Sequence, residues 1–306
     1  MGANSTDFKA IILAGGSGER FWPLSTPERP KQFLRIFGDK SLLRQSVDRL
    51  AGLVESKNIY VVTSAKLKRQ TQLELPEVPA ANIIGEPMRR DTGAAIALGV
   101  ARAKSGVLGF FPADQIVAKE GKFRKALTRA IKAARDADAI VTLGIKPDSP
   151  STAFGYIDPK NGKFVEKPNL NKAKSYIRRG YLWNAGMFIA RADTFRMAFA
   201  QCAPRLMNIK ISDYPKLEKI SFDYAIMEKF ANIKVIEGDF GWDDVGSYAA
   251  FERYFPNKVD GDGNLIISSS QPIKCLGVRN LVIVATKDGV LVIDKSHLDD
   301  MKRLFK

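Results

Sequence analysis

The stretch AIILAGGSGERFWPLSTPERPKQFL, residues 10–34, decides the fold of this chain. Its apolar start, residues 10–13, predicts a buried β-strand, which the following glycines end abruptly. Glycine has no Cβ, so its backbone can approach a ligand closely and present consecutive N–H groups to phosphate oxygens. Arg20 and Lys31 add two cations beyond the same strand. We therefore expect this region to bind a polyanion, with a nucleoside triphosphate as the first choice.

Two common phosphate-binding patterns are absent from this stretch. The dinucleotide pattern G-x-G-x-x-G does not occur, and the Walker pattern fails because Gly18 is followed by Glu19 and Arg20. For a lone Gly-Gly-x-Gly, a tight turn without a ligand is the simpler interpretation. The arginine and the Pro-Lys-Gln-Phe segment that follow favour a ligand site instead.

Composition limits the class of protein. The 306 residues are 45% apolar and 26% charged, as in soluble globular proteins, and no apolar run is long enough to span a bilayer. The N-terminal segment lacks the features of a signal peptide, so we expect a cytoplasmic protein without membrane partners. Cys202 and Cys275 are too few for a cysteine metal site. The single histidine, His297, argues against a Ser-His or Cys-His nucleophile, so any metal would be bound by oxygen, which indicates Mg²⁺.

The net charge is +15, from 48 basic and 33 acidic residues. Binding to nucleic acid is one hypothesis for such a charge. However, the basic residues are spread along the chain, without a basic block or interleaved aromatic residues. A positive field that attracts phosphorylated small molecules accounts for the charge equally well, and we do not expect a nucleic-acid partner.

The first half of the chain alternates between predicted strands and helices, which favours a mostly parallel sheet with helices on both faces. In such sheets, ligands bind beyond the carboxyl ends of the strands. Polar groups follow directly after four of the predicted strands, so we expect them to converge on one rim. These groups are Gly15-Gly16, Glu86, Asp114 and Lys146. The predicted strands cover 10–13, 59–63, 83–84, 107–111 and 139–145, and the predicted helices begin near Ser41 and cover 92–104 and 123–137.

The second half is less regular. Residues 221–230 predict a helix capped by Ser221 or Asp223, and residues 257–270 are rich in turn-forming types. Two apolar runs, 281–286 and 290–294, flank Lys-Asp-Gly and predict a hairpin. We therefore expect a catalytic domain over residues 1–255 and a small β-rich region over 256–306. Further strands are predicted at 154–157, 163–166, 186–190 and 233–236, with helices at 247–254 and about 297–305.

Seven motifs occur in register across the first 250 residues. Together they resemble the sugar-phosphate nucleotidyltransferases, specifically the mannose-1-phosphate guanylyltransferases. This resemblance implies a Rossmann-like fold of the GT-A type, with a mostly parallel mixed sheet flanked by helices. The motifs are the opening stretch, Glu86-Pro87 with Arg90-Asp91-Thr92, Pro112-Ala113-Asp114, FVEKP at 164–168, WNAGMF at 183–188, DYAIME at 223–228 and WDDVG at 242–246.

The resemblance implies a reaction and a set of residues. A sugar-1-phosphate oxygen would attack the α-phosphorus of a nucleoside triphosphate, here GTP with mannose-1-phosphate, and release pyrophosphate. The attacking oxygen is already an anion, so charge neutralisation and positioning supply the catalysis. Arg20 and Lys31 would neutralise charge, and Asp114 and Asp244 would bind Mg²⁺. The alternatives are an Asx turn for Asp114, a helix cap for Asp244, and Asp243 in place of Asp244 as the ligand.

The same resemblance assigns the binding residues. Where the family usually has Asn, this chain has Asp91, whose acceptor oxygens suit the donors of guanine. The alternatives are a buried core position for Tyr156 and an exposed ion pair for Glu166 with Lys167. The nucleotide would contact Leu13, Ala14, Gly15, Gly16, Ser17, Gly18, Glu86, Arg90, Asp91 and Thr92. The sugar phosphate would contact Gly155, Tyr156, Glu166, Lys167 and Asn184.

Three hypotheses follow. The first is a Mg²⁺-dependent enzyme that makes GDP-mannose, with another sugar-1-phosphate or nucleotide, such as glucose-1-phosphate and dTTP, as the alternative within the class. The second is a non-catalytic sensor of nucleotides or sugar phosphates, and the third is a nucleic-acid-binding protein. Where the family frequently has histidine this chain has Gln115, and where it usually has Gly-Tyr this chain has Ala153-Phe154. These differences concern the sugar specificity and not the class of reaction. By analogy with the family, a homodimer built partly through the C-terminal region is expected.

Overall fold

The computed structural model describes residues 7–16, 18–207, 209–269 and 271–305. These residues form two compact units. Unit 1 comprises residues up to Gly15, Ser46–Ala113 and Val117–Trp242, and unit 2 comprises Gly16–Gln45, Asp114–Ile116 and Asp243 onwards. The predicted division into a catalytic domain, residues 1–255, and a C-terminal region, residues 256–306, is a different division of the chain and stays a prediction. In the described part of the chain, no helix combines the length and the apolar character needed to cross a membrane.

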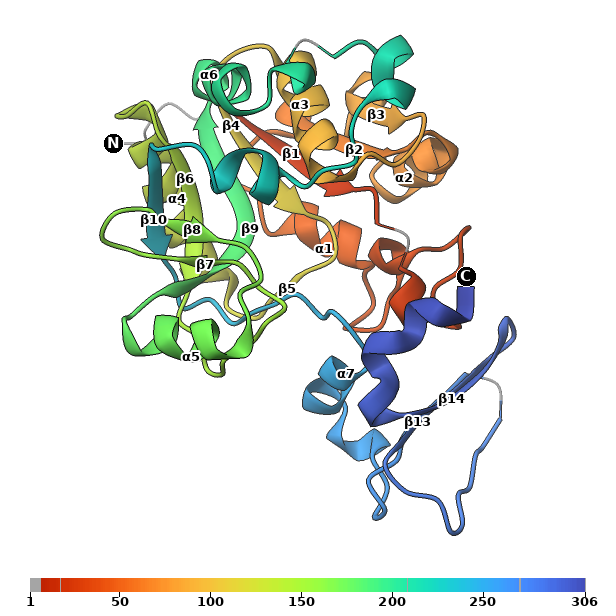
Figure 1. Cartoon of the computed structure of the whole chain (residues 1–306). Helices are drawn as coiled ribbons and strands as arrows, with labels where there is room; N and C mark the ends of the chain where they lie inside the picture. Colours follow the sequence, from red (N-terminus) through yellow and green to blue (C-terminus); the bar gives the residue numbers. More distant parts are fainter. Residues whose placement is uncertain (1–6, 17, 208, 270, 306) are drawn as a thin grey trace. The chain divides into compact units, whose positions relative to one another are not determined.

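Unit 1 is built on a mixed sheet of nine strands among its described residues (Figure 1). The main path runs β10-β6-β9-β4-β1-β2-β3, and the short pair β7 and β8 joins at β9. Within this path β9 alone is antiparallel to its neighbours, β4 and β6. The strands are β1 Phe8–Ala14, β2 Ile59–Ser64, β3 Ile83–Glu86, β4 Val107–Pro112, β6 Ile140–Ile145, β7 Tyr156–Ile157, β8 Phe164–Val165, β9 Leu182–Arg191 and β10 Ile233–Glu237.

Helices cover both faces of this sheet. Successive strand residues point to opposite faces, and in β4 the residues on both faces are buried. On β4, Phe110 packs edge-on against Phe195 of α6, with ring centroids 5.1 Å apart. Its neighbour Phe111 packs against Phe123 of α4 on the other face, at 6.4 Å. The predicted α/β fold, a mostly parallel mixed sheet between helices, is therefore confirmed. The helices of this unit are α2 Lys68–Glu74, α3 Asp91–Ala103, α4 Glu120–Arg135, α5 Leu170–Arg178 and α6 Ala192–Cys202.

Unit 2 has its own apolar core and a three-stranded sheet in the order β12-β13-β14. The predicted hairpin is confirmed by the antiparallel pair β13 Leu281–Thr286 and β14 Gly289–Asp294. β12, Leu265–Ser268, lies within residues 257–270, which are rich in turn-forming types, and it pairs parallel to β13. The remaining elements are α7 Ala249–Tyr254 and the 3₁₀ helices Glu19–Phe21, Lys31–Phe33, Pro256–Lys258 and Lys295–Phe305. α1 Leu42–Asp48, β5 Ile116–Val117 and β11 Trp242–Asp243 contain three of the five positions where the chain passes from one unit to the other, and the other two follow Gly15 and Ala113.

Several predicted elements are shorter than expected; of the strand predicted at 163–166, for example, only β8 Phe164–Val165 forms. The strand predicted at 154–157 is reduced to β7, and the helix predicted at 221–230 is a single π-helical turn, Asp223–Met227. Ser221 caps that turn, since its Oγ accepts a hydrogen bond from the backbone N–H of Tyr224 at 3.3 Å. Asp223 does not act as the cap, which leaves its carboxylate for contacts elsewhere.

Candidate active site

The glycine turn starts where β1 ends. In unit 1, Thr63 of β2 donates its hydroxyl hydrogen to the carbonyl of Ala14, at 3.1 Å, and so holds the last residue of β1. A Cβ on Gly15 would lie 2.9 Å from Glu86 Oε2. A larger residue here would force the Glu86 carboxylate to move, so glycine lets the end of β1 lie close to it. Glycine at position 15 thus accommodates the Glu86 carboxylate, and its predicted contact with phosphate stays a prediction.

The second part of the turn belongs to unit 2, where Gly18 has the left-handed φ of 71°. A Cβ at this position would lie 2.6 Å from the backbone nitrogen of Lys31. Ser25 donates its hydroxyl hydrogen to the Gly18 carbonyl. Ser17, predicted to bind phosphate, lies outside the described residues. Gly18 is thus required both for its backbone conformation and for the close approach to the Lys31 segment.

Lys31 is the centre of the polar cluster in unit 2. It is 6% exposed, and its ammonium lies 5.4 Å from the ring centroid of Phe21. The ammonium donates to Asp114 Oδ2 at 3.0 Å and to the backbone carbonyl of Asp244 at 2.7 Å. A buried ammonium is stable only when oxygens replace its water, and these two acceptors do so. The structure thus brings together three residues predicted from separate motifs.

Asp244 and its neighbour Asp243 differ in their surroundings. The Asp243 carboxylate accepts hydrogen bonds from the N–H of Val245 at 2.8 Å and the hydroxyl of Tyr254 at 3.1 Å, and it pairs with Arg253. Among the residues described, no protein donor is found for the Asp244 carboxylate. The geometry therefore favours Asp244 over Asp243 as the residue that a ligand can reach.

The backbone after Asp244 is strained. Val245 is fully buried and has a φ of 46°, a conformation that costs a β-branched residue free energy. A Cβ on Gly246 would lie 3.0 Å from Asp244 Oδ2 and 3.5 Å from an Arg20 guanidinium nitrogen. Burial raises the pKa of Asp244, and the nearby cations Lys31 and Arg20 oppose that rise. The four predicted catalytic residues thus influence one another within unit 2.

The donor set of this cluster suits a hard divalent cation. No group of three or more His, Cys, Asp or Glu side chains able to hold a metal occurs in the described ranges. Mg²⁺ does not need one, because it retains several waters and takes one or two protein carboxylates together with substrate phosphates. Asp114 and Asp244 offer those carboxylates, and Asp244 has oxygens left for a ligand. The residues present therefore fit Mg²⁺.

In unit 1, the segment predicted to recognise the base is tied to the region around Tyr214. Glu86, the last residue of β3, is buried and accepts a hydrogen bond from the Tyr214 hydroxyl. Burial raises the pKa of Glu86 to about 7, although the Tyr214 hydroxyl and Arg89 favour its ionised form. The Arg90 guanidinium donates to the carbonyls of Tyr214, at 3.3 Å, and Pro215. Arg90 thus supports the residue that holds Glu86.

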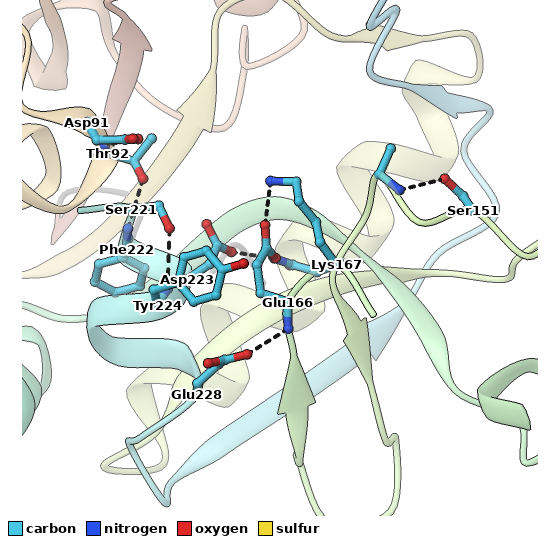
Figure 2. Close-up of polar contacts among 12 residues, drawn as sticks. Asp91, Thr92, Ser151, Glu166, Lys167, Ser221, Phe222, Asp223, Tyr224 and Glu228 are labelled. Atoms are coloured by element: carbon cyan, nitrogen blue, oxygen red, sulfur yellow. Dashed lines mark hydrogen bonds and ion pairs between the residues drawn. The ribbon is translucent and has the colours of Figure 1, made fainter. Parts of the chain in front are cut away.

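Asp91 and Thr92 fix the start of α3. Asp91 has a φ of 65°, and its Oδ1 accepts a hydrogen bond from the N–H of Thr92 at 2.8 Å. Asp and Asn tolerate this conformation better than other side chains do, so both residue types satisfy the backbone here. Thr92 Oγ1 in turn accepts the N–H of Phe222 at 2.9 Å. Figure 2 shows this bond, which links the base segment to the residue before Asp223.

Glu166 and Lys167 lie at the end of β8 in unit 1. The Glu166 side chain is 6% exposed and its carboxylate pairs with the Lys167 ammonium at 2.6 Å. A Cβ on Gly155 would lie 2.7 Å from Glu166 Oε2, so glycine makes room for this carboxylate. The N–H of Glu166 donates to Glu228 Oε1 at 2.9 Å (Figure 2). The carboxylate end of this pair is shielded from solvent, whereas the Lys167 side chain is 54% exposed.

A family model described as Nucleotidyl transferase matches residues 9–260 of this chain. The chain belongs to the nucleotidyl transferase family. Mannose-1-phosphate guanylyltransferase from Escherichia coli is 33% identical to this chain. The alignment is 342 positions long and covers 96% of this chain and 72% of that protein. Xanthan biosynthesis protein XanB from Xanthomonas campestris pv. campestris (strain B100) is also 33% identical and covers 98% and 73%.

A solved structure is similar to this nucleotidyl transferase over its whole length. It is named mannose-1-phosphate geranyltransferase from Thermus thermophilus, with a TM-score of 0.85 and 33% identity over 98% of each chain. The fold and the family predicted from the seven motifs are therefore confirmed.

Of the predicted sugar-site residues, Asn184 and Tyr156 are both buried, but in different surroundings. Asn184 of β9 contacts Asp223 through its amide, with Nδ2 3.1 Å from Asp223 Oδ1. Tyr156 lies in a cluster with Trp183 and Tyr181, and its hydroxyl donates to the carbonyl of Ser151 at 2.9 Å. Tyr156 thus lies in the core, which was the alternative to its predicted place in the sugar site.

Three polar residues of this nucleotidyl transferase were not predicted as site residues: Tyr214, Asp223 and Glu228. Tyr214 belongs to no motif, so the sequence held no signal for it. Asp223 and Glu228 are the first and last residues of the DYAIME motif, to which no role was given. Their contacts to Asn184 and Glu166 are what links this motif to the predicted sugar site.

Proposed function

We propose that this nucleotidyl transferase transfers the GMP group of GTP to mannose-1-phosphate. An oxygen of the sugar phosphate forms a bond to the α-phosphorus of GTP. The bond from that phosphorus to the oxygen bridging the α- and β-phosphates breaks, and pyrophosphate leaves with the electron pair. The products are GDP-mannose and pyrophosphate.

The reaction needs no general base, because the attacking phosphate oxygen is an anion at neutral pH. This requirement agrees with the composition of the chain, whose single histidine, His297, is exposed and contacts Asp300. Positioning and neutralisation of negative charge then carry the catalysis. Arg20 stabilises charge on the departing pyrophosphate, and Lys31 stabilises charge at the α-phosphate.

Asp114 and Asp244 would hold Mg²⁺. When bound, this ion supplies positive charge that offsets the phosphate charges and orients their oxygens. Lys31 contacts Asp114 directly and Asp244 through its carbonyl, so the same lysine fixes both carboxylate-bearing segments. The observation that carries the proposal is this meeting of Lys31, Asp114 and Asp244.

The two substrates would bind to the groups gathered in unit 1. Glu86 accepts hydrogen bonds from the N1–H and N2 amino groups of guanine, with Tyr214 orienting the carboxylate. Glu166 accepts sugar hydroxyl hydrogens, and the ammonium of Lys167 pairs with the sugar phosphate. The name of the Escherichia coli relative supports the choice of mannose-1-phosphate and the guanylyl group.

The test is a matrix of nucleotides and sugar-1-phosphates with Mg²⁺, followed by pyrophosphate release. We expect GTP with mannose-1-phosphate to give the highest kcat/KM and GDP-mannose as the product. A preference for dTTP with glucose-1-phosphate would overturn the substrates while keeping the reaction. Pyrophosphate release from no pair, with tight nucleotide binding retained, would instead indicate a non-catalytic sensor.

A further inference from the structure

The DYAIME motif is anchored so firmly that the side chains at its two ends have fixed positions. Phe222, just before the motif, is fully buried and packs against Phe188 with ring centroids 4.8 Å apart. Ala225, Ile226 and Met227 are buried in the core of unit 1. Asp223 and Glu228 therefore stand on a rigid turn, which is how precisely placed binding groups are usually carried.

The amide of Asn184 is oriented by other groups, and this decides which of its atoms faces Asp223. Asn184 Oδ1 accepts the N–H of Gly186 at 3.1 Å and lies 2.7 Å from the hydroxyl of Thr142. Because the oxygen is held by the N–H of Gly186, the NH₂ group must face Asp223 Oδ1, at 3.1 Å. Asn184 thus acts on the Asp223 carboxylate and fixes its direction.

Glu166 and Asp223 form a pair of carboxylates in unit 1. Figure 2 shows them beside each other, with the Lys167 ammonium bonded to Glu166. Glu228 fixes the backbone of Glu166, as Asn184 fixes the side chain of Asp223. Burial, and next the negative charge of Glu166, raise the pKa of Asp223.

Such a pair is costly for the fold alone, since it places two acidic groups close together at partly buried positions. The Lys167 ammonium, the Asn184 amide and a backbone N–H hydrogen bond to Asp223 satisfy only part of the hydrogen-bond capacity of the two carboxylates. A ligand with several adjacent hydroxyl groups supplies the missing donors without adding charge. The ring of a hexose is such a ligand, and the cationic Lys167 suits its phosphate.

We propose that Asp223 binds hydroxyl groups of the sugar-1-phosphate together with Glu166, and that it helps to determine which sugar is accepted. This inference rests on the proposed function only in taking a sugar-1-phosphate as the substrate. Asn184 is then a positioning residue for Asp223.

The experiment compares the wild type with Asp223→Asn, using mannose-1-phosphate and its monodeoxy analogues. We expect Asp223→Asn to raise KM for mannose-1-phosphate about tenfold or more, with KM for GTP unchanged. Removing the hydroxyl that Asp223 binds costs the wild type a similar factor but costs the variant little, because that contact is already lost. Asp213→Asn, an exposed aspartate of the same unit, is the matched control and retains wild-type constants.

An unchanged KM for the sugar phosphate in Asp223→Asn would overturn the inference. So would an equal loss for every deoxy analogue in both proteins, since that is what a purely structural role predicts. If the wild type prefers another sugar-1-phosphate, mannose-1-phosphate is the wrong substrate. The role of Asp223 is then tested by the same comparison with the preferred sugar. If no sugar-1-phosphate is turned over or bound in calorimetry, both proposals fall.

Discussion

The ammonium of Lys31 lies 3.0 Å from the Asp114 carboxylate, although 83 positions separate the two residues in the sequence. The same ammonium contacts the carbonyl of Asp244, a further segment of unit 2. One buried cation therefore joins three segments that each carry a proposed catalytic group. Lys31 has two effects that can be separated, one on the fold and one on the reacting phosphates.

Lys31→Met tests the catalytic effect. Met retains the apolar contact over Phe21 but has no charge for the α-phosphate or for Asp114. We expect kcat to fall about 10²–10³-fold, as when one preorganised electrostatic donor is removed. The measurement is steady-state pyrophosphate release, with thermal unfolding in parallel. Lys258→Met, an exposed lysine of the same unit, is the control and retains activity. A kcat within threefold of wild type (about 0.7 kcal/mol in barrier) would rule out a role in charge neutralisation.

Local pattern and strand order made much of this site predictable. Glu86 ends β3, Lys146 follows β6 directly, and the glycine turn follows β1, and these three strands run in the same direction. The edge at which these strands end could therefore be derived from apolar runs and the residues after them. The antiparallel direction of β9 could not, because a buried strand has the same apolar pattern in either direction.

The choice of Asp244 over Asp243 came from the resemblance to the family and not from the local pattern. Two adjacent aspartates have the same local pattern, and only the tertiary contacts of Asp243 with Arg253 and Tyr254 show that Asp243 has a structural role. Asp223 was hidden for a similar reason. An aspartate at the start of a predicted helix is normally explained as a cap, and its contact with Asn184 depends on residues 39 positions away.

Asp244→Asn and Asp243→Asn should therefore have opposite effects. We expect Asp244→Asn to lower kcat about 100-fold or more and to raise the Mg²⁺ concentration needed for half-maximal rate, with little change in stability. Asp243→Asn loses the ion pair with Arg253, so we expect the free energy of unfolding to fall by about 1–2 kcal/mol with most of kcat retained. Kinetics over a Mg²⁺ titration and thermal unfolding check both. The reverse pattern would make Asp243 the ligand.

Tyr214→Phe should weaken nucleotide binding in a pH-dependent way. The Tyr214 hydroxyl favours the ionised form of Glu86, so its loss raises the pKa of Glu86 above the value of about 7 in the wild type. Arg89 also favours ionisation, and Asp91 opposes it. Because guanine needs an acceptor, we expect KM for GTP to rise about fivefold at pH 7.

Titration of KM for GTP between pH 6 and 8.5 checks this prediction. In the wild type we expect KM to fall as pH rises through about 7, as Glu86 becomes ionised. The curve for Tyr214→Phe is shifted to higher pH. Glu86→Gln, which cannot ionise, is the control and loses the dependence. Parallel curves for wild type and Tyr214→Phe would show that the hydroxyl does not act through Glu86.

The last prediction concerns the cost of Asp223 to the fold. Burial and the charge of Glu166 raise the pKa of Asp223 to about 7, while Lys167 lowers it and Asp91 raises it further. A carboxyl whose pKa is higher in the folded state than in the unfolded state binds an extra proton when folded. Its contribution to stability is therefore complete below about pH 4, the unfolded pKa, and is lost as pH rises through about 7.

Asp223→Asn removes that titration, so the variant should be more stable than the wild type at pH 8. We expect a gain of about 1–3 kcal/mol in the free energy of unfolding, below the full linkage value because Asp223 is only half-buried. The gain shrinks towards zero near pH 4. Thermal unfolding at pH 5 and pH 8 measures the difference, with Asp213→Asn unchanged at both. A variant that is less stable than the wild type at pH 8 would show that the Asp223 carboxylate stabilises the fold. The free-energy cost that we expect for an ionised Asp223 without bound sugar would then be absent.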